Sequence, residues 1–206
     1  MNQSNEKNNL NTWNQIKKEI ENIYPNQKEP KYEEPIIKWN DGGEDLLDKI
    51  MIYDGGSYWH FITYGLSKHT EEMNPSNDYK VEFSLKLKKD NYKDEEAEFK
   101  EICKQLQSIA KITWNIGITF SNYEYLYVSP NYRLGAKNKS NIIGFISVLD
   151  PTLKQLDTQN LKIEFIEFIG ITKEELNALT TKKITTEELY QKLKYDITDY
   201  NRDSVI

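Results

Sequence analysis

The chain has 206 residues, of which 37% are hydrophobic and 12% aromatic, and this is enough apolar material for one substantial core. Acidic residues outnumber lysine and arginine by 33 to 27, and the basic residues are spread along the chain, so the charge pattern excludes an electrostatic footprint for nucleic acid or anionic lipid. The net charge of −6 serves solubility and would also suit a basic partner.

The N-terminal residues 1–12 are polar and rich in asparagine, and we expect them to be frayed. They contain no apolar segment of the kind that a signal peptide has, and no later stretch approaches the roughly 18 apolar residues that a membrane span needs. The only cysteine, Cys103, cannot form an intramolecular disulfide. These features predict a cytoplasmic protein that does not associate with a membrane.

The first predicted element is an amphipathic helix that ends at Tyr24-Pro25, because Trp13, Ile16, Ile20 and Ile23 fall on one helical stripe. After it, residues 26–43 contain several prolines and the Asp41-Gly42-Gly43 turn. This composition predicts an extended surface connection without helix, held by an apolar anchor. The anchor residues would be Ile36, Ile37 and Trp39.

Two β-rich runs, residues 47–53 and 58–66, flank the turn-forming residues 54–57, and this pattern predicts a hairpin. The next run, residues 79–88, alternates strictly between apolar and polar side chains. It predicts a strand with one buried face and one solvent-facing, charged face. The apolar face would be formed by Val81, Phe83, Leu85 and Leu87.

Residues 94–116 carry apolar side chains at helical spacing and predict the longest helix of the chain. Acidic residues sit at its start, where the positive end of the helix dipole favours them, and we expect them to face solvent. Cys103 lies between Ile102 and Leu106 on the apolar face, which predicts a buried thiol and not a nucleophile. The acidic residues are Asp94, Glu95, Glu96 and Glu98.

The last third of the chain begins with an aromatic-rich segment, 117–127, and a polar loop, 129–140. Two further apolar strands are predicted at 141–149 and 161–169. Two short helices follow, because Thr172 precedes Glu175 by three residues and Thr185 precedes Glu188 likewise, the pattern of a capping box. We therefore predict one α+β domain over residues 13–195, with a mixed, mostly antiparallel central sheet flanked by helices, and a loose polar tail over residues 196–206.

A search for catalytic or metal-binding residues gives a negative result. His60 and His69, the only histidines, are nine residues apart and match no metal motif. The chain contains neither a nucleophile-elbow motif nor a phosphate-binding glycine loop. We predict that the protein is not an enzyme and binds no metal and no cofactor.

One stretch resembles the hallmark of the suppressor-of-fused domain family almost letter for letter. It consists of nine consecutive residues, Trp59, His60, Phe61, Ile62, Thr63, Tyr64, Gly65, Leu66 and Ser67. Other features of the family follow in the expected order, among them Tyr24-Pro25, the strand around Glu82, Asp150-Pro151 and the segment from Phe165 to Thr172. The likeness covers about Trp13 to Leu179. Residues 158–161 depart from it, because Thr158-Gln159-Asn160-Leu161 replaces the usual Thr-Pro-Asn-Gly turn.

The resemblance implies a non-enzymatic protein-binding module. Bacterial single-domain members of the family look like immunity proteins that neutralise a cognate polymorphic toxin, and a basic toxin domain would agree with the acidic charge. Animal members have a second domain and clamp a peptide between the two, which leaves open a regulatory scaffold that binds an extended peptide at a sheet edge. A third alternative, an enzyme, would require His60 to face a polar cleft beside carboxylates.

Alternation along a strand places Trp59, Phe61 and Thr63 on one face and His60, Ile62 and Tyr64 on the other. We interpret the hallmark as mainly structural, with Gly65 permitting a bend, Leu66 following it and His60 making a buried hydrogen bond. For partner contact we instead single out tyrosines that follow no clear packing period, although they would fit a core strand equally well. These candidates are Tyr123, Tyr125, Tyr127 and Tyr132.

Overall fold

A computed structural model of the protein describes residues 14–27, 29–37, 42–68, 80–129, 131–137, 139–158 and 161–206. The predictions for residues 1–12, for Trp13, Trp39 and His69 and for the turn at Gln159-Asn160 therefore lie outside the described residues.

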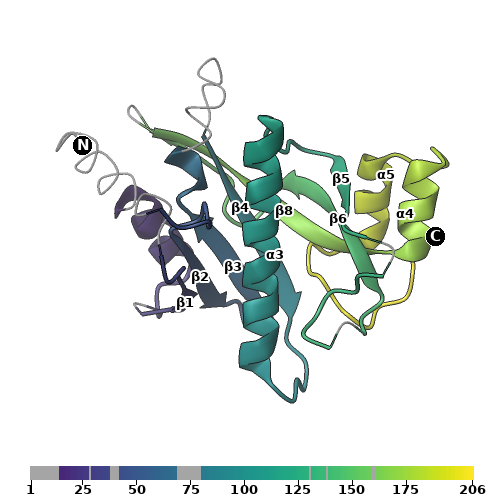
Figure 1. Ribbon diagram of the computed structural model, residues 1–206, viewed down its shortest axis with the longest axis horizontal. Helices are drawn as coiled ribbons and strands as arrows, with labels where there is room; N and C mark the ends of the chain where they lie inside the picture. The colour runs from purple at the N-terminus through teal and green to yellow at the C-terminus, as the bar shows by residue number, and fades with distance from the viewer. Residues whose placement is uncertain are drawn as a thin grey trace.

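The centre of the fold is one mixed sheet, in which eight strands are described (Figure 1). The strand order is β1-β2-β3-β4-β8-β6-β5, and β7 pairs with β8 beside this path. Only β4 and β8 run parallel among the described pairs, which confirms the predicted α+β fold with a mostly antiparallel mixed sheet. The strands are β1 Lys31–Glu33, β2 Lys49–Asp54, β3 Tyr58–Tyr64, β4 Lys80–Lys88, β5 Glu124–Tyr127, β6 Ile142–Leu149, β7 Gln155–Thr158 and β8 Leu161–Thr172.

Helix α3, Glu95–Ile116, begins and ends as its sequence predicts. The side chain of Asp94 accepts a hydrogen bond from the backbone N–H of Ala97, and Gly117 ends the helix with a φ of 72°. Helices α4, Lys173–Thr180, and α5, Thr186–Leu193, both start with a complete capping box. Residues 14–23 form a further helix, as predicted.

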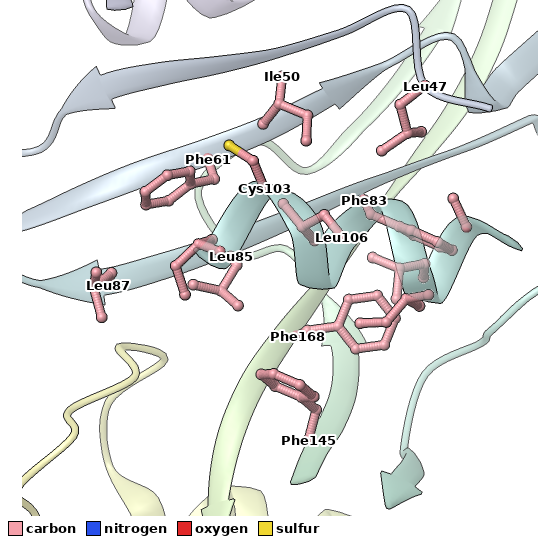
Figure 2. Packing of buried hydrophobic residues seen from close by; sticks show 14 of the residues in the cluster. Leu47, Ile50, Phe61, Phe83, Leu85, Leu87, Cys103, Leu106, Phe145 and Phe168 are labelled. Atoms are coloured by element: carbon pink, nitrogen blue, oxygen red, sulfur yellow. The ribbon is translucent and has the colours of Figure 1, made fainter. Parts of the chain in front are cut away.

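The largest apolar cluster lies between α3 and one face of the sheet. Figure 2 shows Cys103 and Leu106 of α3 pointing toward side chains of β2, β3 and β4, with phenylalanines of β6 and β8 beside them. Cys103 is buried, as predicted, and burial raises the pKa of its thiol.

The opposite face of the sheet carries two smaller apolar clusters. One packs the helix over residues 14–23 against β2, β3 and the start of β8. The other packs α4 and α5 against β6 and the end of β8. Along β8 this face passes from Phe165 in the first cluster through the buried carboxylate of Glu167 to Ile169 in the second. A polar centre therefore separates the two apolar clusters.

Three predictions about individual segments are wrong. Residues 26–43 contain the short strand β1, and Ile36 and Ile37 are exposed to solvent, so they do not anchor the chain. Strand β4 is buried on both faces, because Lys86 and its polar neighbours find partners instead of solvent. Glu98 of α3 is also buried, since its carboxylate accepts a hydrogen bond from the backbone N–H of Ala136.

The C-terminal segment, residues 196–206, packs against the domain and is not the loose tail that we expected. Thr198 is fully buried and forms a parallel bridge with Leu87 of β4. Tyr200 belongs to the main core, and Arg202 forms an ion pair with Glu175 at 2.5 Å. The sequence of this segment does not predict these contacts, because Leu87 and Glu175 are far from it along the chain.

Candidate functional site

The hallmark stretch forms β3, between β2 and β4 in the interior of the sheet. Its two faces divide as predicted. Trp59 and Phe61 stack edge-on against Phe99 of α3, whereas Ile62 belongs to the cluster under the helix over residues 14–23. Both faces of the stretch are thus used for packing, which supports its interpretation as structural.

The end of the stretch surrounds a buried carboxylate, that of Glu82 on β4. Its oxygens accept hydrogen bonds from the hydroxyl of Thr63 at 2.7 Å, from the backbone N–H of Gly65 at 3.0 Å and from that of Ser67 at 2.9 Å. Gly65 turns with a φ of 117°, and a Cβ at this position would lie 2.7 Å from the backbone nitrogen of Asp48. Burial raises the pKa of Glu82 in spite of these donors. The hallmark glycine is therefore required by both conformation and space.

His60 makes the buried hydrogen bond that the sequence analysis expects. Its side chain is 0% exposed, with Nδ1 at 2.7 Å from the Tyr24 hydroxyl and Nε2 at 3.0 Å from Oδ2 of Asp150. Burial lowers the pKa of the imidazole, although the hydrogen bond to Asp150 opposes this shift. The helix over residues 14–23 and the turn after β6 are thus joined through one side chain of β3.

Lys86 lies at the centre of the polar region that separates the two apolar clusters. Its ammonium is 2.8 Å from Oε2 of Glu167 and 3.4 Å from Oδ1 of Asp150, and it also contacts Asp196 of the C-terminal segment. Ser84 donates a 2.6 Å hydrogen bond to Asp150. We call the side chains of His60, Ser84, Lys86, Asp150, Glu167 and Asp196 the Lys86 network.

The electrostatics of the Lys86 network follow from burial and close charges. Burial raises the pKa of Glu167, and the nearby carboxylate of Asp150 raises it further. For Asp150 burial acts in the same direction, but the hydrogen bond from His60 and the charge of Lys86 outweigh it and lower the pKa. Lys86 keeps a raised pKa because Glu167 and Asp150 outweigh its own burial. The network therefore holds one ammonium among carboxyl groups of unequal acidity.

The serine, histidine and aspartate of this network are not arranged for nucleophilic catalysis. Ser84 and His60 both bind the same oxygen of Asp150, so the serine does not donate to the imidazole that would have to activate it. All three side chains are at most 1% exposed. In the described part of the chain, no group of three or more histidine, cysteine or carboxylate side chains is placed to hold a metal ion. The geometry gives the network a structural role.

The structure separates the four candidate tyrosines. Tyr125 and Tyr127 lie on β5 and are 44% and 41% exposed. Tyr123 is half-buried against Tyr190 of α5, with ring centroids 6.2 Å apart. Tyr132 is partly buried against the main core, and its hydroxyl donates to Glu101 at 3.1 Å. Tyr125 and Tyr127 are therefore the exposed members of this set, whereas Tyr123 and Tyr132 are partly buried.

The exposed tyrosines lie on the last strand of the sheet. Among the described strands β5 pairs with β6 alone, so its other edge carries backbone groups that no described strand pairs. Exposed apolar side chains, Ile112, Ile116 and Ile118, mark the end of α3 and the start of the link that leads to β5. Sequence reasoning missed this set, although Ile112 and Ile116 are four residues apart on the outer face of the helix.

Comparison with known proteins links the chain to one family. Residues 43–203 match the family model described as suppressor of fused protein (SUFU). The human and mouse suppressor of fused homologues are each 26% identical over 177 residues, which is 78% of this chain and 35% of theirs. The chain thus spans about a third of the length of these relatives.

Two solved structures share the fold. The crystal structure of the Sufu–Fu complex aligns with a TM-score of 0.76 and 20% identity, covering 92% of this chain and 90% of the other. The crystal structure of Drosophila Suppressor of Fused aligns with a TM-score of 0.78 and 20% identity, covering 94% of this chain and 51% of the other. Within the described residues, no helix combines the length and apolar character that a membrane crossing requires.

Proposed function

Because this chain belongs to the suppressor of fused protein family, we propose that it is a non-catalytic protein-binding module that captures an extended segment of a partner along the edge of β5. The observation that carries this proposal is the outer edge of β5, which no described strand pairs, together with its two exposed tyrosines. A domain of the same fold has been crystallised in a complex of Sufu with Fu, which agrees with binding to another protein.

An incoming segment would be held by two kinds of contact. Backbone groups of the segment would pair with those of β5 and supply affinity without regard to sequence, as in other cases of strand addition. Tyr125 and Tyr127 lie on the same side of β5 and would contact alternate side chains of the partner, which supplies specificity. Ile112 and Ile116 offer apolar contacts for a partner that extends beyond the strand.

For the biological role, we propose neutralisation of a cognate toxin by direct binding. The support is the net charge of −6, which favours encounter with a basic toxin domain, and the resemblance to the suppressor-of-fused family, whose bacterial single-domain members look like immunity proteins. Binding alone would suffice, because occupying a surface of the toxin blocks its function without any chemistry on this chain. The regulatory scaffold differs from this role in the identity of the partner and not in the binding edge.

The test uses a photoreactive amino acid at Tyr127, introduced in the cells in which the protein is naturally made. The matched control places the same group at Tyr195, which is more exposed but lies after α5. We expect one protein to crosslink from position 127 and not from position 195. Crosslinking from both positions, or from neither while the partner still co-purifies, would place the binding surface elsewhere.

The effect of the crosslinked protein on a host cell then distinguishes the immunity role from the scaffold role. Its co-expression in a host should stop growth if it is a toxin, and wild-type protein should restore growth. The Tyr125→Ser/Tyr127→Ser variant should fail to restore it, whereas Tyr195→Ser should succeed. If the captured protein is harmless to the host, the immunity role is wrong and the scaffold role remains.

A further inference from the structure

We propose that the protein forms a two-fold symmetric dimer in which β1 of one copy pairs antiparallel with β1 of a second copy, with Tyr32 at the axis. Strand β1 ends the sheet on the side opposite β5, and among the described strands it pairs with β2 alone (Figure 1). This proposal does not depend on the partner-binding role of β5.

The residues of β1 make the edge complementary to itself. The strand reads Lys31, Tyr32 and Glu33. When two such strands pair antiparallel about Tyr32, Lys31 of each copy lies opposite Glu33 of the other, so the symmetry creates two identical pairs of opposite charge. A segment with two lysines or two glutamates at these positions would repel its own copy.

The side chains of β1 lie on the faces that such a pairing needs. Lys31 extends over the α3 face, where its ammonium is 3.4 Å from Glu95 and 4.8 Å from the ring centroid of Phe99, yet more than half of the side chain is exposed. Alternation places Glu33 on the same face. Tyr32 lies on the other face, 53% exposed, with the ammonium of Lys49 at 4.2 Å from its ring centroid. The two tyrosines would therefore meet at the axis as a cross-strand aromatic pair.

The flanking residues limit the pairing and set its register. Pro30 and Pro35 have no backbone N–H to donate, so the pairing cannot extend far beyond the three residues of β1. Just after the strand, Ile36 is fully exposed and Ile37 is 56% exposed. A second copy paired at this edge, which no described strand pairs, would cover these apolar side chains and account for their exposure in the single copy. So short an edge predicts a weak dimer that forms only at high protein concentration.

Charge variants test the proposal in a way that a general loss of stability cannot imitate. Lys31→Glu makes the strand Glu-Tyr-Glu, and Glu33→Lys makes it Lys-Tyr-Lys. Each variant alone should raise the dimer dissociation constant by about tenfold or more, because the symmetry repeats every repulsion. An equimolar mixture of the two should dimerise again, as each lysine then faces a glutamate. The double variant Lys31→Glu/Glu33→Lys should also dimerise.

The measurement is sedimentation velocity over a concentration series up to the solubility limit, with thermal unfolding of each variant as a control for folding. The double variant loses the Lys31–Glu95 contact just as Lys31→Glu does, so its recovery separates pairing across the axis from that contact within one copy. A wild-type protein that stays monomeric throughout the series, or charge variants that dimerise as well alone as in the mixture, would overturn the proposal.

Discussion

Two buried charged side chains of β4, Glu82 and Lys86, each connect several parts of this fold. Glu82 fixes the end of the hallmark stretch, and Lys86 holds together strands and loops that are far apart in the sequence. Buried charges of this kind are costly to leave unpaired, so each one imposes a specific arrangement on its surroundings. We propose that the hallmark stretch serves this arrangement and not direct partner contact.

Glu167 links the stability of the fold to pH. Its pKa is raised in the folded state, so the folded protein binds more protons than the unfolded one between the unfolded pKa, near 4.5, and the folded pKa. This contribution to stability is therefore present at low pH and is lost as the pH rises through the folded pKa. The Glu167→Gln variant removes this titration, and we expect its free energy of unfolding relative to wild type to increase with pH above about 4.5.

Urea unfolding of both proteins across a pH series checks this expectation. The difference between them is the relevant quantity, because His60 contributes in the opposite direction: its lowered pKa makes stability rise as the pH rises toward about 6.5. A difference that stays constant with pH would show that Glu167 is ionised equally in both states.

Two features of Gly65 oppose a larger residue: its φ is positive, and there is no room for a Cβ. Gly117 shares only the first feature and therefore serves as a control. We expect Gly65→Ala to lower the free energy of unfolding by about 2–3 kcal/mol, since its Cβ would meet the backbone of Asp48. Gly117 also has a positive φ, but no atom lies within 4 Å of an added Cβ, so Gly117→Ala should cost only about 1 kcal/mol. Equal losses in the two variants would mean that the local structure relaxes around the new methyl group.

At the scale of elements, part of the C-terminal segment lies beside β4 beyond the point where β4 and β8 stop pairing. Strand β4 pairs with β8 from Lys80 as far as Ser84, which lies opposite Glu167. Beyond that point Thr198 takes the place beside β4, because its backbone bonds Lys86 and Lys88 at 2.8 Å and 2.9 Å. Its hydroxyl also accepts a hydrogen bond from the backbone N–H of Gly170 on β8 at 2.9 Å. The segment therefore joins two strands that have separated.

The hydroxyl of Thr198 is the part of this contact that a substitution can isolate. Thr198→Val keeps the shape of the side chain but leaves the buried N–H of Gly170 without an acceptor, and we expect a loss of about 1–3 kcal/mol in the free energy of unfolding. Thr180→Val, at an exposed position of α4, should change stability by less than about 0.5 kcal/mol. Chemical denaturation measures both values. If Thr198→Val is as harmless as its control, the segment is held by its other contacts.

At the scale of the whole molecule, the sequence predicts what depends on local pattern and fails where partners are distant. The periodicity of Phe99, Ile102 and Leu106 was sufficient to predict α3 and the core beneath it. The same reasoning assigned Lys86 to solvent, because its partners Asp150, Glu167 and Asp196 lie 64, 81 and 110 residues away.

The four candidate tyrosines show the same difference between features that local sequence predicts and features that depend on distant contacts. The aromatic density of residues 123–132 singled out this segment, but only the fold shows that Tyr125 and Tyr127 lie on an edge strand while Tyr132 is partly buried against the core. Strand β1 escaped prediction altogether, since three residues between prolines carry too little pattern to be recognised. Whether a strand lies at the edge of a sheet depends on the order of all the strands, so the sequence of one segment does not reveal it.

The edges of β1 and β5, the two ends of the sheet among the described strands, should bind independently. The dimer proposed at β1 would leave both copies of β5 accessible and facing away from the axis, so that each dimer carries two partner sites. We expect Tyr125→Ser/Tyr127→Ser to lose the partner but to dimerise like wild type, and Lys31→Glu to lose the dimer but to bind the partner with unchanged affinity per chain. Sedimentation with and without the purified partner measures both properties in one series. If either change affects both properties, the two edges are coupled through the sheet, and the partner then binds preferentially to one oligomeric state.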